Sequence, residues 1–438
     1  MDSKVLVLAT LCALGASCTV RPTIHVPTFA NGGMLRDATP LPQTTYDALA
    51  AAWTVGGTGF DLFGRDLVSK AAVSRLSLFG RTSAIYSILE GGCLDGGSRV
   101  VFEGHWRYAE TTQVGLIRLF SERGDVAAKM CGGTFSVQDL KGTALSGFWG
   151  NGDEDPNAPM RAQYGAPLRS DVDENGIPDF LAGAHRSTAT IQDYGVSENS
   201  LPAIRMAELM GAEFIEGDTR LTKDGKVVLL HDDELSPRLV QGRFCKGYVS
   251  DLTLAELRAA CRLENGEEIP LLEDALAVAF TSTRLRGMWL DTKVAEALAP
   301  EMEIAAKYTR MGAARQAAGG LQFVVAVGMF EEALVDTYVS LPHPDGTVCL
   351  IEYDRTAAKN AGCLFWAPRF TLGPMADEVA AAQADGLRVV YWTVNGTNVI
   401  DKFLTVGKPN AMISDTPGLV FYKYHIGDFT PPHPRGKN

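Results

Sequence analysis

The sequence lacks the long apolar runs of a membrane-spanning bundle. Its apolar stretch near the N-terminus, Val5 to Ala16, is shorter than the roughly 20 residues needed to cross a bilayer. An excess of basic residues is also missing, because the formal net charge is −12. That charge argues against nonspecific binding to nucleic acid, which depends on Lys and Arg neutralising phosphates. Hydrophobic residues at 46% and charged residues at 21% indicate a globular chain rather than a disordered one.

The N-terminal residues resemble an export signal. Residues 1–17 combine a short apolar run with small residues at its end, so we expect a signal peptide. The small residues before Cys18 are also similar to the lipid-attachment site of bacterial lipoproteins, although Leu14 lies one position too early. We therefore expect an exported protein, secreted or in the cell envelope. Plain secretion and a lipid anchor on Cys18 both stay open.

Cysteine spacing typical of a zinc site is absent. The chain has eight cysteines, and Cys12 would be removed with the signal peptide. Apart from Cys18, the remaining six are Cys93, Cys131, Cys245, Cys261, Cys349 and Cys363. They fall into three pairs of neighbours along the sequence, and an oxidising compartment favours disulfides between them. Six cysteines allow 15 connectivities, so other pairings and free buried thiols are the alternatives.

The length and the local patterns predict two domains. The 438 residues exceed one ordinary core, and the irregular, proline-containing residues 18–45 are expected to be a tether. Residues 46–150 contain short apolar and aromatic runs separated by glycine, which predict an all-β sandwich or barrel. Trp106 and Trp149 are candidates for a ligand groove, but we expect them to pack in the core. The sequence indicates no function for this domain.

Residues 151–179 are expected to be a polar linker, part of which resembles a calcium-binding loop. Oxygen-bearing side chains stand at the first, third, fifth and ninth positions of such a loop, namely Asp171, Asp173, Asn175 and Asp179. Gly176 occupies the sixth position, where glycine permits a sharp turn. Ala182 stands at the twelfth position, where calcium loops carry a glutamate. A structural calcium site and an ordinary polar turn are both open.

From residue 180 to residue 425, short apolar strands alternate with helical stretches. This pattern predicts an α/β fold, a TIM-like (β/α)8 barrel. The expected strands are residues 180–184, 213–218, 227–231, 288–293, 322–327, 389–393 and 412–415, with either 348–352 or 364–367 as the sixth. The long segment between His231 and Met288 predicts a small insertion after the third strand, placed as a cap over the mouth. Residues 426–438 are expected to be a disordered tail.

Ionisable residues gather at the ends of four of these strands. They are His185 and Arg186, followed by Glu198 and Asn199; Glu216 and Asp218; His231 and Asp232 after the turn Thr222 to Gly225; and Asp291 with Lys293. Because side chains alternate along a strand, Glu216 and Asp218 point to the same face, where they repel each other unless a cation lies between them. Catalytic residues of TIM barrels lie at these strand ends, so the pattern predicts an active site.

In order and separation, these residues resemble the motifs of the glycerophosphodiester phosphodiesterase family. The family pattern reads His-Arg, Glu-Asn, Glu-x-Asp, Thr-Lys-Asp-Gly, His-Asp and Glu-x-Lys, and its Trp-Thr-Val-Asn stretch is similar to residues 392–395. The resemblance covers the whole expected barrel. Ser187 replaces the usual Gly, Ser197 the usual Pro, and Asp291 the usual Glu. The related sphingomyelinase D branch is similar in using Asp at the last of these positions.

The resemblance implies a metal site and an acid–base pair. Glu216, Asp218 and Asp291 would hold one divalent cation, and carboxylate oxygens favour calcium or magnesium over zinc. His185 and His231 would act as general acid and general base, in an order that the sequence does not fix.

The resemblance also implies residues that bind or support the substrate. Arg186 and Lys293 would pair with the phosphate oxygens, which lets an acidic protein bind an anion. Glu198 would orient Arg186 or His185, and Trp392 would line the pocket. Asn199 is expected to cap the helix that follows it.

Three functions stand as alternatives. The expected one is metal-dependent hydrolysis of glycerophosphodiesters to glycerol 3-phosphate and an alcohol. The second is a lysophospholipase D or a sphingomyelinase D-like lipid phosphodiesterase, which Asp291, a membrane anchor and apolar residues near the mouth would favour. The third is a cell-surface binding protein without catalysis. The expected partner is a small phosphodiester or a lysolipid and not nucleic acid, and no protein partner is identified.

Overall fold

The computed structural model describes residues 25–80, 85–108, 111–169, 178–187 and 195–427. The predicted signal peptide and Cys18 lie outside the described residues, as do Asp171, Asp173 and Asn175 of the calcium-like loop and all but two residues of the predicted tail. Asp179 is described and buried. Among the described residues, no helix is both long and apolar enough to span a bilayer.

The N-terminal domain is an antiparallel β barrel. Its strands are β1 (Thr39–Pro40), β2 (Ala51–Gly57), β3 (Asp66–Ala72), β4 (Arg75–Gly80), β5 (Ile85–Leu94), β6 (Arg99–Tyr108), β7 (Val114–Ser121), β8 (Ala144–Trp149) and β9 (Ala158–Pro167). Strands β2 to β9 pair each with the next, and β2 also pairs with β9, so the eight strands close. The short β1 adds to β5. Closure leaves few unpaired strand edges.

Apolar side chains fill the inside of this barrel. Trp106 is 1% exposed, its ring meets that of Trp149 edge to face at 6.0 Å, and its indole N–H donates to the carbonyl oxygen of Gly150 at 2.9 Å. Both tryptophans therefore pack in or against the core, as expected. Short helices α2 (Gln43–Ala48), α3 (Gly59–Phe63) and α4 (Gly124–Cys131) lie around the barrel.

The predicted boundaries of this domain need correction at both ends. Strand β1 and the first half of α2 fall within the predicted tether 18–45, and β9 falls within the predicted linker 151–179. Only Met160 and Ala162 of β9 are buried, so the segment lacks the run of apolar residues by which a strand is recognised in a sequence. Backbone pairing with β2 on one side and β8 on the other makes the segment a strand.

The C-terminal domain is the predicted TIM-like barrel. Its eight parallel strands are β10 (Leu181–Ala184), β11 (Phe214–Leu221), β15 (Gly287–Thr292), β16 (Val324–Met329), β17 (Val348–Ile351), β18 (Phe365–Trp366), β19 (Arg388–Tyr391) and β20 (Ala411–Ser414). Pairing of β10 with both β11 and β20 closes the barrel. Both candidates for the sixth strand are present, as β17 and β18.

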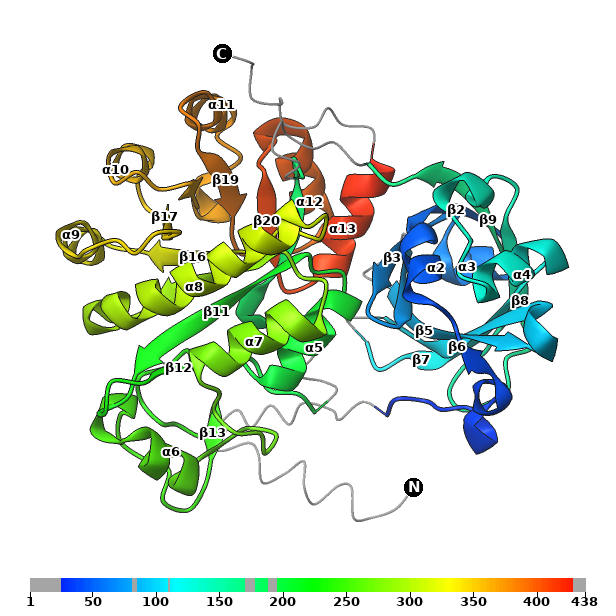
Figure 1. Ribbon diagram of the computed structural model, residues 1–438, viewed down its shortest axis with the longest axis horizontal. Coiled ribbons are helices and arrows are strands. Elements are labelled where there is room, and N and C mark those ends of the chain that lie inside the picture. The colour runs from blue at the N-terminus through cyan, green and yellow to red at the C-terminus, as the bar shows by residue number, and fades with distance from the viewer. Residues whose placement is uncertain (1–24, 81–84, 109–110, 170–177, 188–194, 428–438) are drawn as a thin grey trace, which may run out of the picture.

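Helices cover the outside of this barrel (Figure 1). They are α5 (Leu201–Leu209), α7 (Leu272–Ser282), α8 (Leu298–Ala317), α9 (Glu332–Ser340), α10 (Arg355–Asn360), α11 (Ala376–Ala384), α12 (Thr397–Lys402) and α13 (Pro417–Ile426). Helix α5 begins where the Ser200 hydroxyl accepts a hydrogen bond from the backbone N–H of Ala203 at 3.1 Å, with a proline in its first turn.

The third predicted strand does not join the parallel barrel. Strand β12 (Val227–Leu229) pairs antiparallel with the outer end of β11. The turn between the two strands is too short for the crossover that a parallel pair requires. The insertion follows β12 and contains β13 (Val240–Gln241), α6 (Leu254–Ala260) and β14 (Arg262–Leu263), with a small apolar core of its own.

All three expected disulfides are present. Cys93–Cys131 joins β5 to α4, Cys245–Cys261 ties the insertion together, and Cys349–Cys363 joins β17 to the segment before β18. The pairing of neighbours along the sequence is therefore confirmed among the alternatives.

One hydrophobic cluster joins the two barrels, in addition to the separate core of the N-terminal barrel. Phe79 of β4 is 1% exposed and meets the ring of Phe421 of α13 at 5.7 Å. Gly418 lets the Phe79 ring approach α13, because a Cβ at position 418 would lie 2.6 Å from that ring. Figure 1 shows α5 and α13 facing the N-terminal barrel. The side chain of Lys70 crosses the same interface and donates to the carbonyl oxygen of Glu208 at 3.1 Å.

Candidate active site

One pocket, at the C-terminal ends of the barrel strands, is lined by the predicted site residues. It has a volume of about 340 Å³ and is lined by His185, Arg186, Glu216, Asp218, His231, Trp289, Asp291, Lys293, Phe330, Glu352, Arg369, Trp392 and Ile413. Every predicted catalytic, metal-binding and substrate-binding residue lies here except Glu198, which stands behind Arg186. Sheet register explains the meeting of the acidic residues, because Asp218 of β11 pairs directly with Asp291 of β15.

Three carboxylates form a cluster suited to a cation. Oxygens of Glu216, Asp218 and Asp291 lie within 4.8 Å of one another. One oxygen of Glu216 and one of Asp291 are buried without a hydrogen-bond partner among the described residues. Burial, followed by the charges of the two aspartates, raises the pKa of Glu216 well above its usual value. A hard divalent cation would satisfy both orphaned oxygens and remove the repulsion, so the donor set fits calcium or magnesium.

Basic side chains surround the acidic cluster. The Lys293 ammonium contacts Asp291 and lies 2.9 Å from an oxygen of Asp218. Burial alone would lower the pKa of Lys293, but these two carboxylates outweigh it and raise that pKa. The Arg186 guanidinium lies 3.8 Å from Asp218 and 3.3 Å from Glu198. Glu198 therefore orients Arg186, one of the two roles expected for it, and both cations face a site where phosphate oxygens can bind.

Each histidine is held by a carboxylate. The Nδ1 atom of His185 lies 2.8 Å from Asp415, and the Nδ1 atom of His231 lies 2.7 Å from Asp232. Arg238 in turn donates two hydrogen bonds to Asp232 at 2.8 and 2.7 Å. With Nδ1–H donating to a carboxylate, Nε2 is left to accept or give a proton in the pocket. The Nε2 atom of His231 lies 4.0 Å from Asp218, at the edge of the acidic cluster.

Asn199 supports Asp218 and does not cap the helix, which corrects the prediction. Ser200 supplies the cap. The Asn199 side-chain N–H donates to an oxygen of Asp218 at 2.8 Å, and its amide oxygen accepts from the Asp218 backbone N–H at 3.3 Å. Asn199 adopts a φ of 58°, in the left-handed region that asparagine tolerates. The amide thus fixes the side chain of a predicted metal ligand.

Sequence reasoning missed Asp415, Glu352 and Arg369. Asp415 follows β20. Burial alone would raise its pKa, but the hydrogen bond and charge of His185, with smaller contributions from Asn395 and Arg186, together outweigh burial and lower that pKa. Glu352 is 5% exposed at the end of β17, and burial followed by the charge of Asp291 raises its pKa to about 8. Arg369 follows β18 and lies 4.9 Å above the Trp392 ring. Position at a strand end was the available signal, but single polar residues at strand ends are common.

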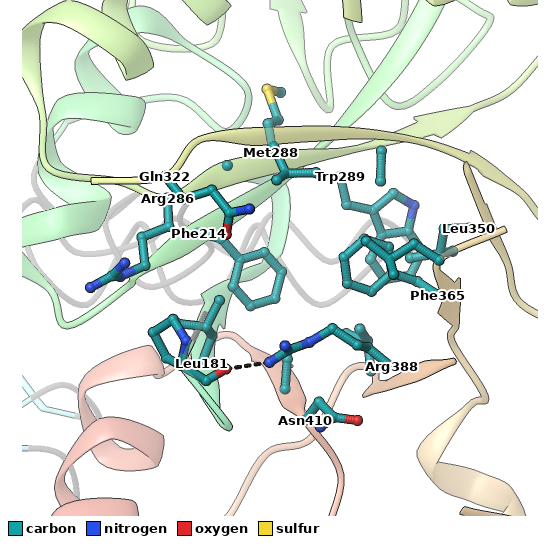
Figure 2. A pocket seen from close by; sticks show the side chains of 17 residues that line it. Leu181, Phe214, Arg286, Met288, Trp289, Gln322, Leu350, Phe365, Arg388 and Asn410 are labelled. Atoms are coloured by element: carbon teal, nitrogen blue, oxygen red, sulfur yellow. Dashed lines mark hydrogen bonds between the residues drawn. The ribbon is translucent and has the colours of Figure 1, made fainter. Parts of the chain in front are cut away.

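Aromatic rings form the floor and one side of the pocket. Trp392 lines it as predicted, and its ring meets that of Trp289 at 6.1 Å. Trp289 also lines a second, apolar cavity at the opposite end of the barrel, together with Phe214, Leu350 and Phe365 (Figure 2). Arg388 lies at the rim of that cavity and donates to the carbonyl oxygen of Pro178. Trp289 thus lines both cavities, and the acidic cluster lines only the one at the C-terminal end.

Comparison with known proteins gives relatives that match part of this chain. A protein of Mycobacterium tuberculosis named probable glycerophosphodiester phosphodiesterase 2 is 35% identical over 124 residues, 28% of this chain and 42% of that protein. Human glycerophosphodiester phosphodiesterase 1 is 37% identical over 102 residues, 22% of this chain and 28% of that protein. The matches thus span less than half the length of either relative.

A solved structure and a family profile also match the chain. The structure of a glycerophosphodiester phosphodiesterase from Thermotoga maritima aligns with a TM-score of 0.42 and 19% identity, covering 55% of this chain and 96% of that one. The profile described as the glycerophosphoryl diester phosphodiesterase family matches residues 183–419. Since this segment exceeds half of the chain and contains the pocket, the protein belongs to the glycerophosphoryl diester phosphodiesterase family.

Proposed function

We propose that the protein is a metal-dependent phosphodiesterase that hydrolyses glycerophosphodiesters to glycerol 3-phosphate and an alcohol. The observation that carries the proposal is the meeting of three carboxylates and two carboxylate-held histidines in one pocket. Family membership supports the class of reaction. The intact acid–base pair weighs against the alternative of a binding protein without catalysis.

Different residues of the pocket have different roles in an in-line displacement at phosphorus. Glu216, Asp218 and Asp291 would hold one divalent cation, which supplies positive charge for the phosphate oxygens. Arg186 and Lys293 bind those oxygens and hold the charge that develops on them in the transition state.

Two proton transfers complete the reaction. The Nε2 atom of one histidine takes the proton of the attacking oxygen, and the Nε2 atom of the other gives a proton to the leaving oxygen. The pairs His185–Asp415 and His231–Asp232 keep both Nε2 atoms available for these tasks. The attacker is water or a hydroxyl of the substrate that first forms a cyclic phosphate, and either route uses the same residues.

The test is release of glycerol 3-phosphate from glycerophosphocholine by the purified protein with calcium, magnesium or a chelator. His185→Ala and His231→Ala should each lower kcat by about 100-fold or more, because each removes a proton transfer. His343→Ala is the matched control, since this histidine contacts the Tyr338 carbonyl outside the pocket. Turnover that persists in chelator, or in both histidine variants, contradicts the proposal.

A second candidate is a lipid-directed phosphodiesterase, and exposed apolar residues near the mouth favour it. Tyr353 is 43% exposed, Phe370 36% and Leu372 61%, and the first two directly follow the pocket residues Glu352 and Arg369. Such side chains suit contact with an acyl chain. Choline release from lysophosphatidylcholine or sphingomyelin, faster than from glycerophosphocholine, would select this candidate. No choline release from any of the three substrates would favour the binding protein without catalysis.

We also propose that the protein is exported, either secreted or attached to the cell envelope through Cys18. The three disulfides support an oxidising compartment. Mass spectrometry of the protein from an expressing bacterium tests the proposal. A mature chain starting near residue 18, with or without a lipid, agrees with export, and an intact N-terminus in the cytosol contradicts it.

A further inference from the structure

A second group of polar side chains faces the acidic cluster across the pocket. Glu352 directly follows β17, and Arg369 lies three residues after β18. In the strand order of the closed barrel, β17 is four strands from β10 in either direction, and β18 is four from β11. Glu352 and Arg369 therefore stand across the mouth from His185 and from the metal-binding end of β11, on a wall that the proposed reaction does not use.

The side chain of Glu352 is buried without a hydrogen bond. It is 5% exposed and lines the pocket, and among the described residues no group donates to its carboxyl oxygens. These oxygens are not among the sealed, unpaired polar atoms of the described residues, so they open onto the pocket. It is also outside the cluster of three carboxylates that lie within reach of one cation. A carboxyl group that faces a pocket and has no protein donor is free to accept a hydrogen bond from a ligand. A substrate hydroxyl in the pocket would supply one.

Arg369 provides the complementary donor. Its guanidinium stacks over the ring of Trp392 at 4.9 Å, and among the described residues its side chain makes no ion pair or hydrogen bond. Stacking holds the flat guanidinium in place while its N–H groups remain free to donate. An acceptor and a donor thus lie on neighbouring strands of one wall.

Aromatic side chains complete this wall. Phe330 after β16 and Trp392 after β19 line the pocket on either side of Glu352 and Arg369. A ligand that fits has hydroxyl groups along one edge and C–H groups along the other, as a glycerol unit does. Aromatic rings can attract a quaternary ammonium group, but Arg369 already covers the ring of Trp392 and would repel it, and such a group has no hydroxyl for Glu352.

We infer that Glu352 and Arg369 form a subsite for the vicinal hydroxyl groups of the glycerol unit attached to the phosphate. The inference rests on the proposed function and names the part of the substrate that this wall recognises. The phosphate lies at the metal-binding side, the diol at Glu352 and Arg369, and the alcohol that leaves points elsewhere. The subsite selects diesters with a free diol over diesters whose hydroxyls are esterified or absent.

Ligand binding tests the subsite without turnover. Titration calorimetry with magnesium or calcium present compares glycerol 3-phosphate with n-propyl phosphate, which has the same number of carbons and neither hydroxyl. The protein should bind glycerol 3-phosphate about 10-fold or more tightly than propyl phosphate, since a site built for hydroxyls rejects the analogue that lacks them. Glu352→Ala and Arg369→Ala should each remove most of that preference, and Glu352→Gln should keep part of it. Equal affinity for both ligands in the unchanged protein overturns the inference.

Kinetics separate this inference from the proposed function. The ratio of kcat/KM for glycerophosphocholine to that for bis(4-nitrophenyl) phosphate, which has no hydroxyls, should fall about 10- to 100-fold in Glu352→Ala. Glu331→Ala, an exposed carboxylate on the neighbouring loop, is the control and should keep the ratio. Parallel loss on both substrates means that Glu352 serves the phosphate site, which overturns the subsite. Failure of the unchanged protein on glycerophosphocholine alone counts against the proposed function, and the binding preference still decides the subsite.

Discussion

His185 and Asp415 lie 2.8 Å apart, joined through Nδ1 of the imidazole, although 230 positions separate them in the chain. The pair follows from closure of the barrel. Ala184 of β10 pairs with Ser414 of β20 in parallel register. His185 and Asp415 are the residues that directly follow these two strands. Asn395 then holds the other oxygen of Asp415, donating from its side chain at 2.6 Å. The imidazole is thereby fixed in one orientation and one tautomer.

Asp415→Asn should impair catalysis without unfolding the protein. An amide at this position can donate to Nδ1, which would place the imidazole proton on Nε2 and leave that atom unable to accept a proton in the pocket. We expect kcat on glycerophosphocholine to fall about 100-fold or more, by analogy with other carboxylate–histidine pairs. Asp385→Asn, which alters an ion pair on the barrel surface, is the control. An unaltered rate and pH profile in Asp415→Asn would show that His185 needs no such support.

Asn199→Ala should weaken metal binding. The asparagine holds Asp218 through two hydrogen bonds, and loss of such support commonly costs about 10- to 100-fold in metal affinity. Ser200→Ala is the matched variant, because it removes the cap of α5 and should cost about 1 kcal/mol of stability with metal affinity kept. Calorimetric titration and thermal melts measure both. The assignment is wrong if the two variants exchange these effects.

Phe79→Ala should destabilise the protein at the interface between the two barrels. The ring is 1% exposed and packs against Phe421, so its removal should cost about 3–5 kcal/mol. Because the site joins two domains, calorimetry should also show a broader transition or two separate ones. Phe60→Ala, at a ring that is 41% exposed, is the control and should cost much less. A loss below about 1 kcal/mol for Phe79→Ala would mean that the interface adds little.

Glu301→Gln should make stability less dependent on pH. Burial raises the pKa of Glu301 from 4.5 to about 7, and the carboxyl accepts a hydrogen bond from Thr292 at 2.6 Å. Between these two pH values the folded state keeps a proton that the unfolded state has lost, so stability falls as pH rises. The full loss is about 3 kcal/mol.

Urea unfolding in chelator at pH 5 and at pH 7.5 measures this dependence. Glu301→Gln should lose about 2 kcal/mol less than the unchanged protein between these two pH values, because part of the full loss falls outside this window. Glu303→Gln changes an exposed carboxylate on the same helix and is the control. Equal pH dependence in all three proteins would show that Glu301 ionises normally.

Local patterns were enough to predict the parts of the site that belong to strand ends. The alternation of β11 indicated that Glu216 and Asp218 share a face, and both line the pocket. The apolar runs of the C-terminal half predicted a barrel because each buried parallel strand must be apolar along its whole length. Glu352 could not be recognised in the same way, because its significance depends on burial and on the lack of a hydrogen bond.

The limits of the sequence appear where pairing decides structure. The residues of β9 look like a linker, and they form a strand because β2 and β8 each offer an unpaired edge. The residues of β12 look like a barrel strand, and a short turn returns them antiparallel to β11. Neither outcome is encoded by the side chains of the segment itself.

The sequence by itself determined the type of barrel, the disulfide partners among neighbours, and the chemical groups that meet at the mouth. These depend on residue type and spacing, which a chain carries locally. Only the tertiary structure decided that Asp415 holds His185, that Asn199 holds Asp218, and that Glu352 faces the pocket without a partner. These contacts join distant segments, and the closure of the barrel and the register of its backbone hydrogen bonds bring those segments together.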